Sequence, residues 1–469
     1  MDNSLTELII YRGNRDVSVE STSERCYVYS IGSGRVKSTD FIDLNNSKRL
    51  NLLSQEVRDS YTEWVYSLND QYLKTGLCVD DLSLFFLTDL SCKRSELFDI
   101  YDNVCNLLLL RERLAKVEVD SALLIGVDEG FVRAFKSIFS NTNVRVSRTE
   151  RTSITIWRRI AADILYLYRL LGVTVINTFS RAKIESESLG AKSYFFSFFP
   201  QMFSTEGGEE KYGSFFRDSD RYVVTILSDG VHQKVSLAEY AKYSRVSTLK
   251  GHLLVDRFFR LADVWLGLIW LCKTSWYYCK YRNRLHVFSN IDVTGLVRPV
   301  LCFSLSHIGR LIVFASAFRR FVNVTQLDKL VYYPHEYPFG RMISYVLSKY
   351  QPSTIRVGFQ MGIVSERRTE QFLATGEARH RGSYLNHVPI PDLVLAETKE
   401  AKEIYHNSGY KNVEVMERIY RYEYLASVKP KKCVDWVLIA PGLHDGEFLL
   451  RVLESYIGQN KQTTFVLKP

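Results

Sequence analysis

The sequence VYYPHEYPFGRMISYVLSK (residues 331–349) decides the fold class, because an apolar strand-like run, a proline-bounded loop and a helical pattern follow one another in it. The pattern predicts a helix that begins at Phe339, and further along the chain a strand over Leu393–Ala396 and a helix over Lys399–Asn407. Alternating strands and helices of this kind are typical of an open parallel α/β sheet. The order recurs in the stretches that follow: IRVGFQMG (355–362), VPIPDLVLAETKEAKEIYHNSGY (388–410) and VEVMERIYRYEYL (413–425).

Polar residues follow several of these strands directly. Glu336, Gln360 and Arg421 each lie just beyond an apolar run. Ligands of open α/β sheets bind beyond the carboxyl ends of the strands. We therefore expect these three residues at a ligand-binding edge.

Size and composition limit the classes of function. A chain of 469 residues predicts two to three domains. The 13% aromatic content indicates extensive contact surfaces, such as those for sugars or lipid. The net charge of +9 fits an anionic partner, such as a nucleotide, an anionic glycan or a membrane surface. Zinc-knuckle, helicase and RNA-binding signatures are missing, so nucleic acid is not an expected partner.

The cysteines and the first residues of the chain indicate its compartment. The eight cysteines show no Cys-x-x-Cys spacing, so a zinc site is not expected. MDNSLTELIIYRGNRD (1–16) is too polar for a signal peptide. The sequence predicts a protein of the reducing cytoplasm.

The chain divides into four parts by pattern. Residues 1–150 predict a Rossmann-like half-domain, which contains the strand, acidic loop and helix of SALLIGVDEGFVRAFKSIF (121–139). Residues 151–285 predict a region of amphipathic helices and aromatic loops. Residues 286–425 continue the α/β domain with a catalytic loop, and residues 426–469 begin a carboxyl-terminal nucleotide-binding domain. Because the chain stops directly after a strand, we expect this last domain to be truncated.

Two segments of the second part are unusually aromatic. The first is FFRLADVWLGLIWLCKTSWYYCKYRNR (258–284). Its apolar run is too short to span a bilayer, because a spanning helix needs about 20 consecutive apolar residues. Its tryptophans and flanking basic residues fit a helix in the membrane interface, and a buried helix with a basic surface is the alternative. SYFFSFFPQMFSTEGGEEKYGSFFRD (193–218) predicts an irregular binding loop or a structural plug over a cleft.

Several stretches together resemble a family of bacterial surface-carbohydrate (O-antigen or capsule) biosynthesis proteins of the GT-B glycosyltransferase type. The resemblance implies two Rossmann-type domains with parallel sheets, the second truncated here, and a helical membrane-associated insertion. The final FVLKP (465–469) is similar to a strand of transferases that use CMP-linked Kdo or sialic acid. The blocks that carry the resemblance are SLFFLTDLSCKRSELFDIYDNVCNLLLL (83–110), FFSFFPQMFSTEGGEEKYGSFFRD (195–218), YYPHEYPFGRMISYVLSK (332–349), IRVGFQMG (355–362) and PIPDLVLAETKEAKEIYHNSGY with RYEYL (389–425).

The resemblance implies a cytoplasmic glycosyltransferase, peripheral on the inner membrane, that needs no metal and no cofactor. Its donor would be a nucleotide sugar, with a CMP-linked acidic sugar favoured, and its acceptor a glycan or lipid-linked glycan. The sequence departs from the family in three places: Gly340 replaces an acid, Met361 replaces a histidine, and one extra residue separates Glu417 from Arg421. These departures keep open a non-catalytic glycan-binding or assembly protein. A nucleotide-sugar epimerase or dehydrogenase is disfavoured, because IGSG (31–34) is followed by no helical pattern.

Sugar transfer needs a carboxylate, charge stabilisation of the departing phosphate, and a cleft that excludes water. Glu336 is the first candidate for the carboxylate, although it could instead cap the following helix or pair with Arg341. Asp292 and Asp128 are the alternatives, with helix capping as their other interpretation. Candidate donor-binding residues are Gln360, Arg418, Arg421, Gly442, His444, Asp445, Gly446 and Lys468, and candidate acceptor-binding residues are Ser197, Phe199 and Tyr212.

Overall fold

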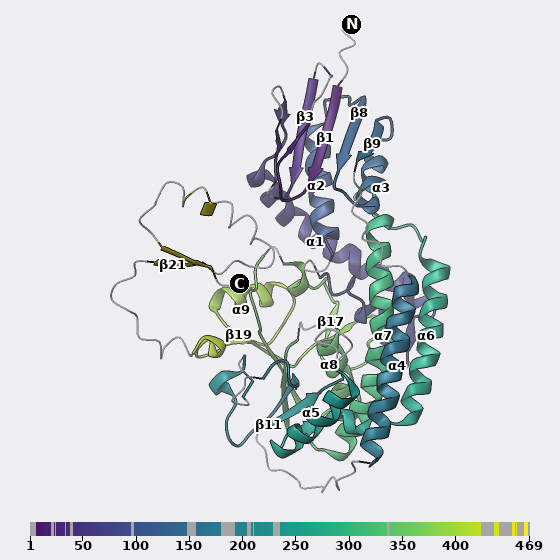
Figure 1. The fold of residues 1–469 in the computed structure, drawn as a ribbon, viewed down its shortest axis with the longest axis vertical. Coiled ribbons are helices and arrows are strands. Elements are labelled where there is room, and N and C mark those ends of the chain that lie inside the picture. The colour runs from purple at the N-terminus through teal and green to yellow at the C-terminus, as the bar shows by residue number, and fades with distance from the viewer. Residues whose placement is uncertain are drawn as a thin grey trace.

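Two parallel β-sheets, of five and seven strands, organise the chain (Figure 1). The expected α/β architecture with parallel sheets is thereby confirmed. The structure is a computed structural model and describes residues 6–19, 23, 25–32, 34–37, 41–94, 98–147, 156–179, 193–203, 208–209, 211–227, 235–334, 338–366, 368–423, 436–439, 453–454, 456 and 464–467.

The five-stranded sheet belongs to the amino-terminal part. Its central strand is β1. The chain first adds β3 and β5 on one side of β1, and later adds β8 and β9 on the other side. β1 is apolar on both faces, as a central parallel strand requires. In spatial order the strands are β5 (Ile42–Asp43), β3 (Arg25–Ile31), β1 (Thr6–Arg12), β8 (Ser121–Ile125) and β9 (Asn143–Ser147).

The two faces of this sheet are covered differently. Leu8 and Ile10 of β1 belong to the main core together with residues of α1 (Ser47–Leu73), α2 (Ile100–Arg113) and α3 (Glu129–Ile138). Ile9 points to the other face, where a smaller apolar cluster is closed by the segment that carries β2 (Val17–Ser18) and β4 (Val36–Lys37). All described helices of this part thus lie on one face.

The seven-stranded sheet is built from two separate stretches of sequence. β10, β11 and β12 run from the centre to one edge, and β15, β16, β19 and β20 run to the other, all parallel. The spatial order is β12 (Leu253–Leu254), β11 (Arg221–Thr225), β10 (Tyr194–Phe198), β15 (Lys329–Tyr332), β16 (Ile355–Phe359), β19 (Leu393–Ala396) and β20 (Val413–Val415).

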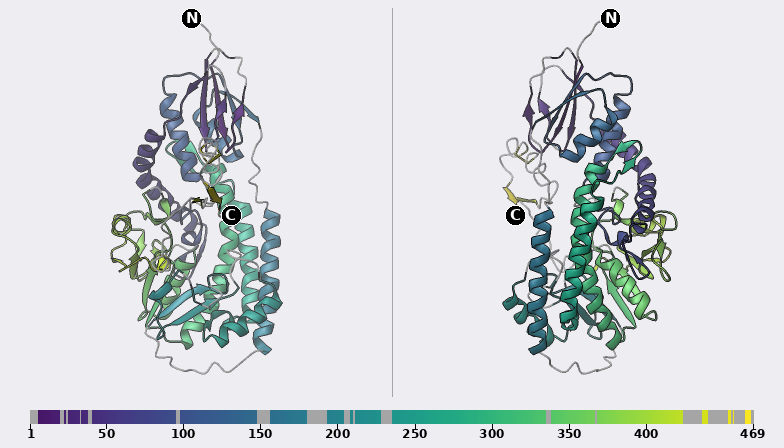
Figure 2. Two further views of the ribbon diagram at one scale, coloured as in Figure 1. Left: turned by 60° about the vertical axis from the view of Figure 1, so that its left-hand side comes forward. Right: turned by 90° about the vertical axis from the view of Figure 1, so that its right-hand side faces the viewer.

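Three long helices form a layer beside this sheet (Figures 1 and 2): α4 (Ile156–Phe179), α6 (Leu261–Tyr281) and α7 (Thr294–Val324). α7 is the innermost, since Phe314 contacts Phe196 of β10 and Phe339 of α8 (Phe339–Tyr350). α5 (Leu237–Leu249) begins with a capping box of Ser236 and Glu239, and α9 (Lys399–Asn407) is capped by Thr398.

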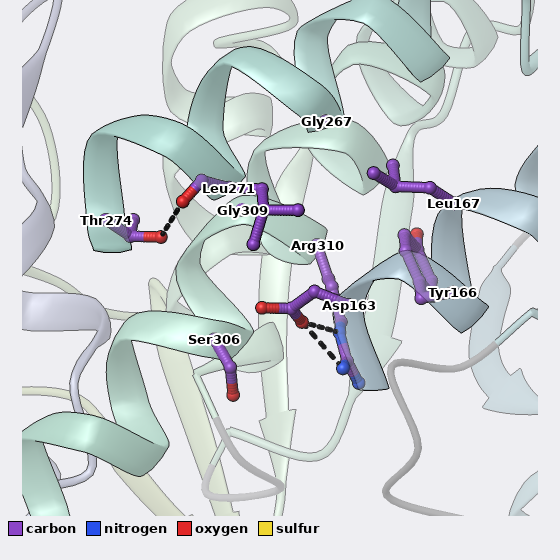
Figure 3. Close-up of a pocket in the computed structure, with 9 residues that line it drawn as sticks. All are labelled: Asp163, Tyr166, Leu167, Gly267, Leu271, Thr274, Ser306, Gly309 and Arg310. Carbon is purple, nitrogen blue, oxygen red and sulfur yellow. Dashed lines mark hydrogen bonds and ion pairs between the residues drawn. The ribbon is translucent and has the colours of Figure 1, made fainter. Parts of the chain in front are cut away.

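The centre of the three-helix layer is closely packed (Figure 3). Arg310 of α7 donates to Asp163 of α4 at 2.7 Å. Gly267 of α6 leaves room for Leu167 of α4, whose Cδ2 would lie 2.4 Å from a Cβ at that position. Only about 10 Å³ of cavity remains between the helices, which is room for no more than about one water molecule.

The remaining described elements are short. They include the parallel pair β21 and β22, which matches the strands expected at the end of the chain. These elements are β6 (Cys78–Val79), β7 (Leu82–Ser83), β13 (Val287–Phe288), β14 (Ile291–Asp292), β17 (Ala378–Arg379), β18 (Val388–Pro389), β21 (Trp436–Ile439), β22 (Thr464–Leu467) and the 3₁₀ turns η1 (Leu84–Leu87), η2 (Gly213–Phe215), η3 (Val255–Phe258), η4 (Thr369–Gln371) and η5 (Tyr420–Tyr422).

Most predicted elements have the predicted bounds. α8 begins at Phe339, and β19 and α9 span the predicted residues. The range 151–285 differs, because it contributes β10, β11 and β12 to a sheet that it was not expected to join. The aromatic segment 193–218 therefore begins with the central strand of that sheet, whose side chains are buried on both faces.

Two helices in the described part of the chain, α4 and α7, are long and apolar enough to cross a membrane by length and composition. Most of the apolar window of α7 is buried inside the protein, whereas most of that of α4 is not. α7 is therefore a core helix, and α4 has an apolar face that the protein leaves uncovered.

A buried carboxyl group ties β11 to the turn after β12. Asp256 is fully buried and accepts hydrogen bonds from Thr225 Oγ1 at 2.5 Å and from the backbone N–H groups of Ile226 and Leu227 at 2.8 and 2.9 Å. Burial raises the pKa of Asp256 to about 6, although these hydrogen bonds favour the charged form. Because an unfolded aspartate has a pKa of about 3.9, the folded state binds this proton more tightly.

Protonation of Asp256 should therefore stabilise the fold below about pH 4, and this stabilisation should be lost as the pH rises through about 6. We expect the unfolding free energy of the wild type, relative to that of Asp256→Asn, to fall by roughly 2 kcal/mol between pH 4 and 7. Urea unfolding of both proteins across this range measures the difference. Parallel pH profiles would show that Asp256 does not titrate in this way.

Candidate functional site

The carboxyl edge of the seven-stranded sheet is the candidate site. Chain order reverses between β10 and β15, and ligands of open α/β sheets bind at such a switch point. The strands that end at this edge lead directly into Phe199, Tyr333, Gln360, Glu397 and Met416. Each strand thus delivers a different side chain to one edge.

A carboxylate and a phenol meet near the switch point. Tyr333 follows β15, and its hydroxyl donates to Glu209 Oε1 at 2.7 Å. The Tyr212 backbone N–H donates to the other carboxylate oxygen at 2.9 Å. The Tyr212 and Tyr333 rings stack with centroids 4.8 Å apart, and Lys211 Nζ lies 5.7 Å from the Tyr333 ring centroid. Glu209 is consequently held in one orientation at the carboxyl edge.

A second polar group joins the next two strands to the turn after β20. Arg421 Nη2 donates to Glu397 Oε2 at 2.7 Å. Gln360 Oε1 accepts from the Glu397 backbone N–H, and Gln360 Nε2 donates to the Gly362 carbonyl, each at 2.8 Å. Burial raises the pKa of Glu397, and the Arg421 guanidinium opposes that rise. Gln360 and Arg421, both predicted donor-binding residues, are brought together by Glu397.

Arg418 is the more accessible cation at this edge. It pairs with Glu423 at 2.5 Å, and its guanidinium lies 5.3 Å from the Tyr420 ring centroid. Its side chain is 58% exposed, whereas that of Arg421 is 19% exposed. Arg418 can therefore meet an anion from solvent at small desolvation cost.

The predicted acceptor residues lie in the core. Ser197 and Tyr212 are completely buried, and Phe199 nearly so. The Tyr212 hydroxyl donates to the Phe196 carbonyl at 2.8 Å. These side chains have evident packing roles, and contact with an acceptor stays a prediction.

The two aspartates predicted as alternative catalytic residues both lie beside α3 of the amino-terminal part. Asp128 caps α3 by accepting from the Phe131 backbone N–H at 2.8 Å, and it lies 3.6 Å from Arg12. Asp292 accepts from Arg133 Nε at 2.7 Å. Burial would raise the pKa of Asp292, but hydrogen bonds from Thr294 and Arg133 outweigh it and lower that pKa. Neither aspartate lies at the carboxyl edge of the seven-stranded sheet.

Six predicted site residues lie outside the described residues: Glu336, Gly442, His444, Asp445, Gly446 and Lys468. The neighbours of Glu336 do explain one departure from the resembled family. A Cβ at Gly340 would lie 2.5 Å from the Pro334 carbonyl oxygen. Arg341 donates to the Phe86 carbonyl at 2.7 Å and to Ser91 Oγ at 2.8 Å. Position 340 therefore has no room for an acidic side chain.

A polar pocket of about 580 Å³ lies at the carboxyl edge of the smaller sheet, between β3, α1 and α2. The Tyr29 hydroxyl donates to Asn106 Oδ1 at 2.6 Å. Asn45 hydrogen-bonds both backbone groups of Ser30, at 2.8 and 2.7 Å. This volume falls in the range of small-molecule sites. The amides and hydroxyls that line it suit a ligand rich in hydroxyl groups.

Sequence reasoning missed Tyr333, Glu397, Glu209 and the pocket. Tyr333 and Glu397 directly follow the apolar runs of β15 and β19, so the rule that selected Gln360 would also have selected them. Glu209 follows no strand of the sheet, and its position depends on the packing of Tyr212 against Tyr333. The sequence carries no local signal for such a contact.

Among the described residues, no three His, Cys, Asp or Glu side chains are grouped in a way that could hold a metal ion. Comparisons with protein-family models, with curated proteins and with solved structures find no match to this chain.

The close approach of η2 to η5 generates a prediction. Gly213 has a φ of +49°, and a Cβ there would lie 2.7 Å from the Tyr420 carbonyl oxygen. We expect Gly213→Ala to destabilise the fold by about 1–3 kcal/mol and to displace the turn that carries Arg421. Thermal unfolding measures the loss. Gly208→Ala is the control, because Gly208 has open space around its Cα, and equal effects of the two variants would contradict the packing argument.

Proposed function

We propose that the protein is a glycosyltransferase of bacterial surface-polysaccharide synthesis, which transfers a sugar from a nucleotide donor to a glycan or lipid-linked acceptor. The observation that carries the proposal is that two acid-centred pairs, Tyr333 with Glu209 and Arg421 with Glu397, lie along one carboxyl edge of a parallel sheet, the first of them at its switch point. The GT-B resemblance of the sequence adds the expectation of two Rossmann-type domains. The parallel sheets of five and seven strands are compatible with a Rossmann-like α/β fold.

The charges at the carboxyl edge suit a nucleotide sugar. A departing nucleoside phosphate needs nearby positive charge, and a guanidinium can bind it in a bidentate manner. In the proposed complex Arg418 receives the phosphate or the carboxylate of an acidic sugar, and Arg421 supports it. Glu397 acts as a positioning residue for Arg421. The favoured donor is a CMP-linked acidic sugar.

The polar pocket of the smaller sheet is the proposed place for the acceptor glycan. Sugar hydroxyls both donate and accept hydrogen bonds, and the amides of Asn45, Asn51 and Asn106 can do the same. The proposal places the enzyme in the cytoplasm, peripheral on the inner membrane, where a lipid-linked acceptor is available. It involves no metal and no cofactor.

A non-catalytic glycan-binding protein is the second candidate. The observation in its favour is the packing of Gly340 against Pro334, which excludes an acid where the resembled family has one. A chain of this kind would keep the polar pocket and lose the transfer reaction.

Nucleotide binding separates the two candidates. We expect one of CMP, UDP, GDP, ADP and NAD to raise the melting temperature, since a ligand at 100 times its Kd stabilises a fold by about 2.7 kcal/mol. Arg418→Ala should weaken that binding about 10-fold to 100-fold, because it removes a charge-assisted hydrogen bond. Arg145→Ala is the matched control, since Arg145 is similarly exposed but lies on β9. A chain that binds none of these nucleotides would support the glycan-binding protein.

The catalytic carboxylate can be tested independently. Glu336 is the residue that the resemblance favours, and we expect Glu336→Gln to fold normally and to lose transfer about 10²-fold to 10⁴-fold. Sugar transfer from the donor identified by nucleotide binding is the measurement, and circular dichroism checks the fold. Wild-type turnover in this variant would refute the assignment and direct attention to Glu209 and Glu397.

A further inference from the structure

The outer faces of α4 and α6 are unusually apolar. Trp157 of α4 and Trp265 and Trp276 of α6 are 74%, 69% and 58% exposed. Monomeric soluble proteins rarely expose large continuous apolar patches, and such patches mark interaction sites. We call this surface the α4–α6 face, and its other large exposed apolar residues are Ile164, Leu165, Tyr168, Leu171, Val175, Phe179, Leu261, Leu268 and Ile269.

The two helices present these residues on one surface. Arg159 near the start of α4 donates to Thr274 near the end of α6 at 2.5 Å, and Leu167 further along α4 packs on Gly267. The helices are therefore antiparallel neighbours, and Figure 1 shows them side by side. Both helices pack on α7, which separates them from the seven-stranded sheet. The α4–α6 face thus points away from the sheet.

Negative and positive side chains lie on different sides of the two helices. Their only carboxylates, Asp163 and Asp263, are buried and pair with Arg310 and Arg320 of α7. The exposed charged residues on α4 and α6 are all basic: Arg158, Lys273 and Lys280. Lys280 Nζ lies 4.7 Å from the Trp276 ring centroid. The α4–α6 face is therefore apolar, aromatic and positively charged, with no exposed carboxylate.

We propose that the α4–α6 face docks on an anionic phospholipid bilayer, with both helices lying in the interface and neither crossing the membrane. Tryptophan, tyrosine and basic side chains are those that the headgroup region favours. Lysines and arginines near anionic lipids gain electrostatic attraction. A spanning arrangement is disfavoured, because the inner sides of both helices carry ion pairs with α7.

A second copy of the chain fits this face less well. A two-fold interface brings the same patch of both subunits together. In such a dimer the basic residues of one α4–α6 face would lie against the basic residues of the other. Neither copy has an exposed carboxylate on these helices to balance that charge. Anionic headgroups supply the opposite charge. The inference deepens the membrane location in the proposed function and requires no particular chemistry at the carboxyl edge.

Vesicle co-sedimentation tests the proposal with the full chain and without a transfer assay, so its failure and that of the proposed transfer reaction are distinguishable. The probes are phosphatidylcholine vesicles with and without phosphatidylglycerol. We expect binding to the mixed vesicles only, with a blue shift of tryptophan fluorescence. Changing Arg158, Lys273 and Lys280 together to Gln should weaken binding on the order of 100-fold, or about fivefold per charge.

A second variant tests the apolar part of the face. Trp157→Ser, Trp265→Ser and Trp276→Ser combined should release the protein from the mixed vesicles at an unchanged melting temperature, because all three side chains are exposed. Leu52→Ser with Ile355→Ser is the control, since these exposed apolar residues lie on α1 and β16, and it should bind as the wild type does.

Three results would overturn the proposal. The first is equal binding to vesicles with and without phosphatidylglycerol. The second is unchanged binding of the tryptophan variant. The third is a wild type that binds no vesicle and forms a dimer that the tryptophan variant dissociates, as measured by light scattering. The third result would assign the α4–α6 face to a second copy of the chain.

Discussion

The packing of α7 is the constraint on which the rest of the structure depends. At its start, Gly295 meets Gly130 of α3 so closely that a Cβ on Gly295 would lie 2.7 Å from the Gly130 Cα. In its middle, Phe314 contacts β10 and α8, and Arg310 binds Asp163 of α4. One helix therefore joins the two sheets and supports the outer helices. A larger residue at position 295 would separate the smaller sheet from this support.

The carboxyl edge of the seven-stranded sheet inherits its geometry from this packing. β10 and α8 both rest on Phe314, and the residues between β15 and α8 include the position of Glu336. Tyr333 at the end of β15 orients Glu209. Gly340 at the start of α8 has no side chain, which allows the Pro334 backbone to pack against it. The polar side chains at the switch point are consequently positioned by a rigid apolar scaffold, as a preorganised site requires.

The sequence predicts the parts of the fold that have a local signal. The strand–loop–helix patterns after residue 331 are of this kind, and α8, β19 and α9 have the expected bounds. β10 was missed because YFFSF carries neither an alternating pattern nor a β-branched residue, and its identity as a strand comes from burial between β11 and β15. The same limit applies to Glu209, which is bound by residues distant in the sequence. Post-strand position identified Gln360 and Arg421, and applied consistently it also identifies Glu397.

Post-strand acids nevertheless have two distinct fates in this fold. The Asp128 carboxylate caps α3, and the Asp292 carboxylate accepts hydrogen bonds from Arg133 and Thr294, so both have structural roles. Glu397 also pairs with an arginine, but it does so where several strands end together and where burial raises its pKa. What separates the two cases is the bonding partner: Asp128 lies beside Arg12 at the end of β1 but caps α3, whereas the Glu397 carboxylate accepts from Arg421 and positions that cation. The net charge of +9 acts on top of this geometry, because it favours the approach of an anionic nucleotide to Arg418 and of anionic lipid to Lys273 and Lys280.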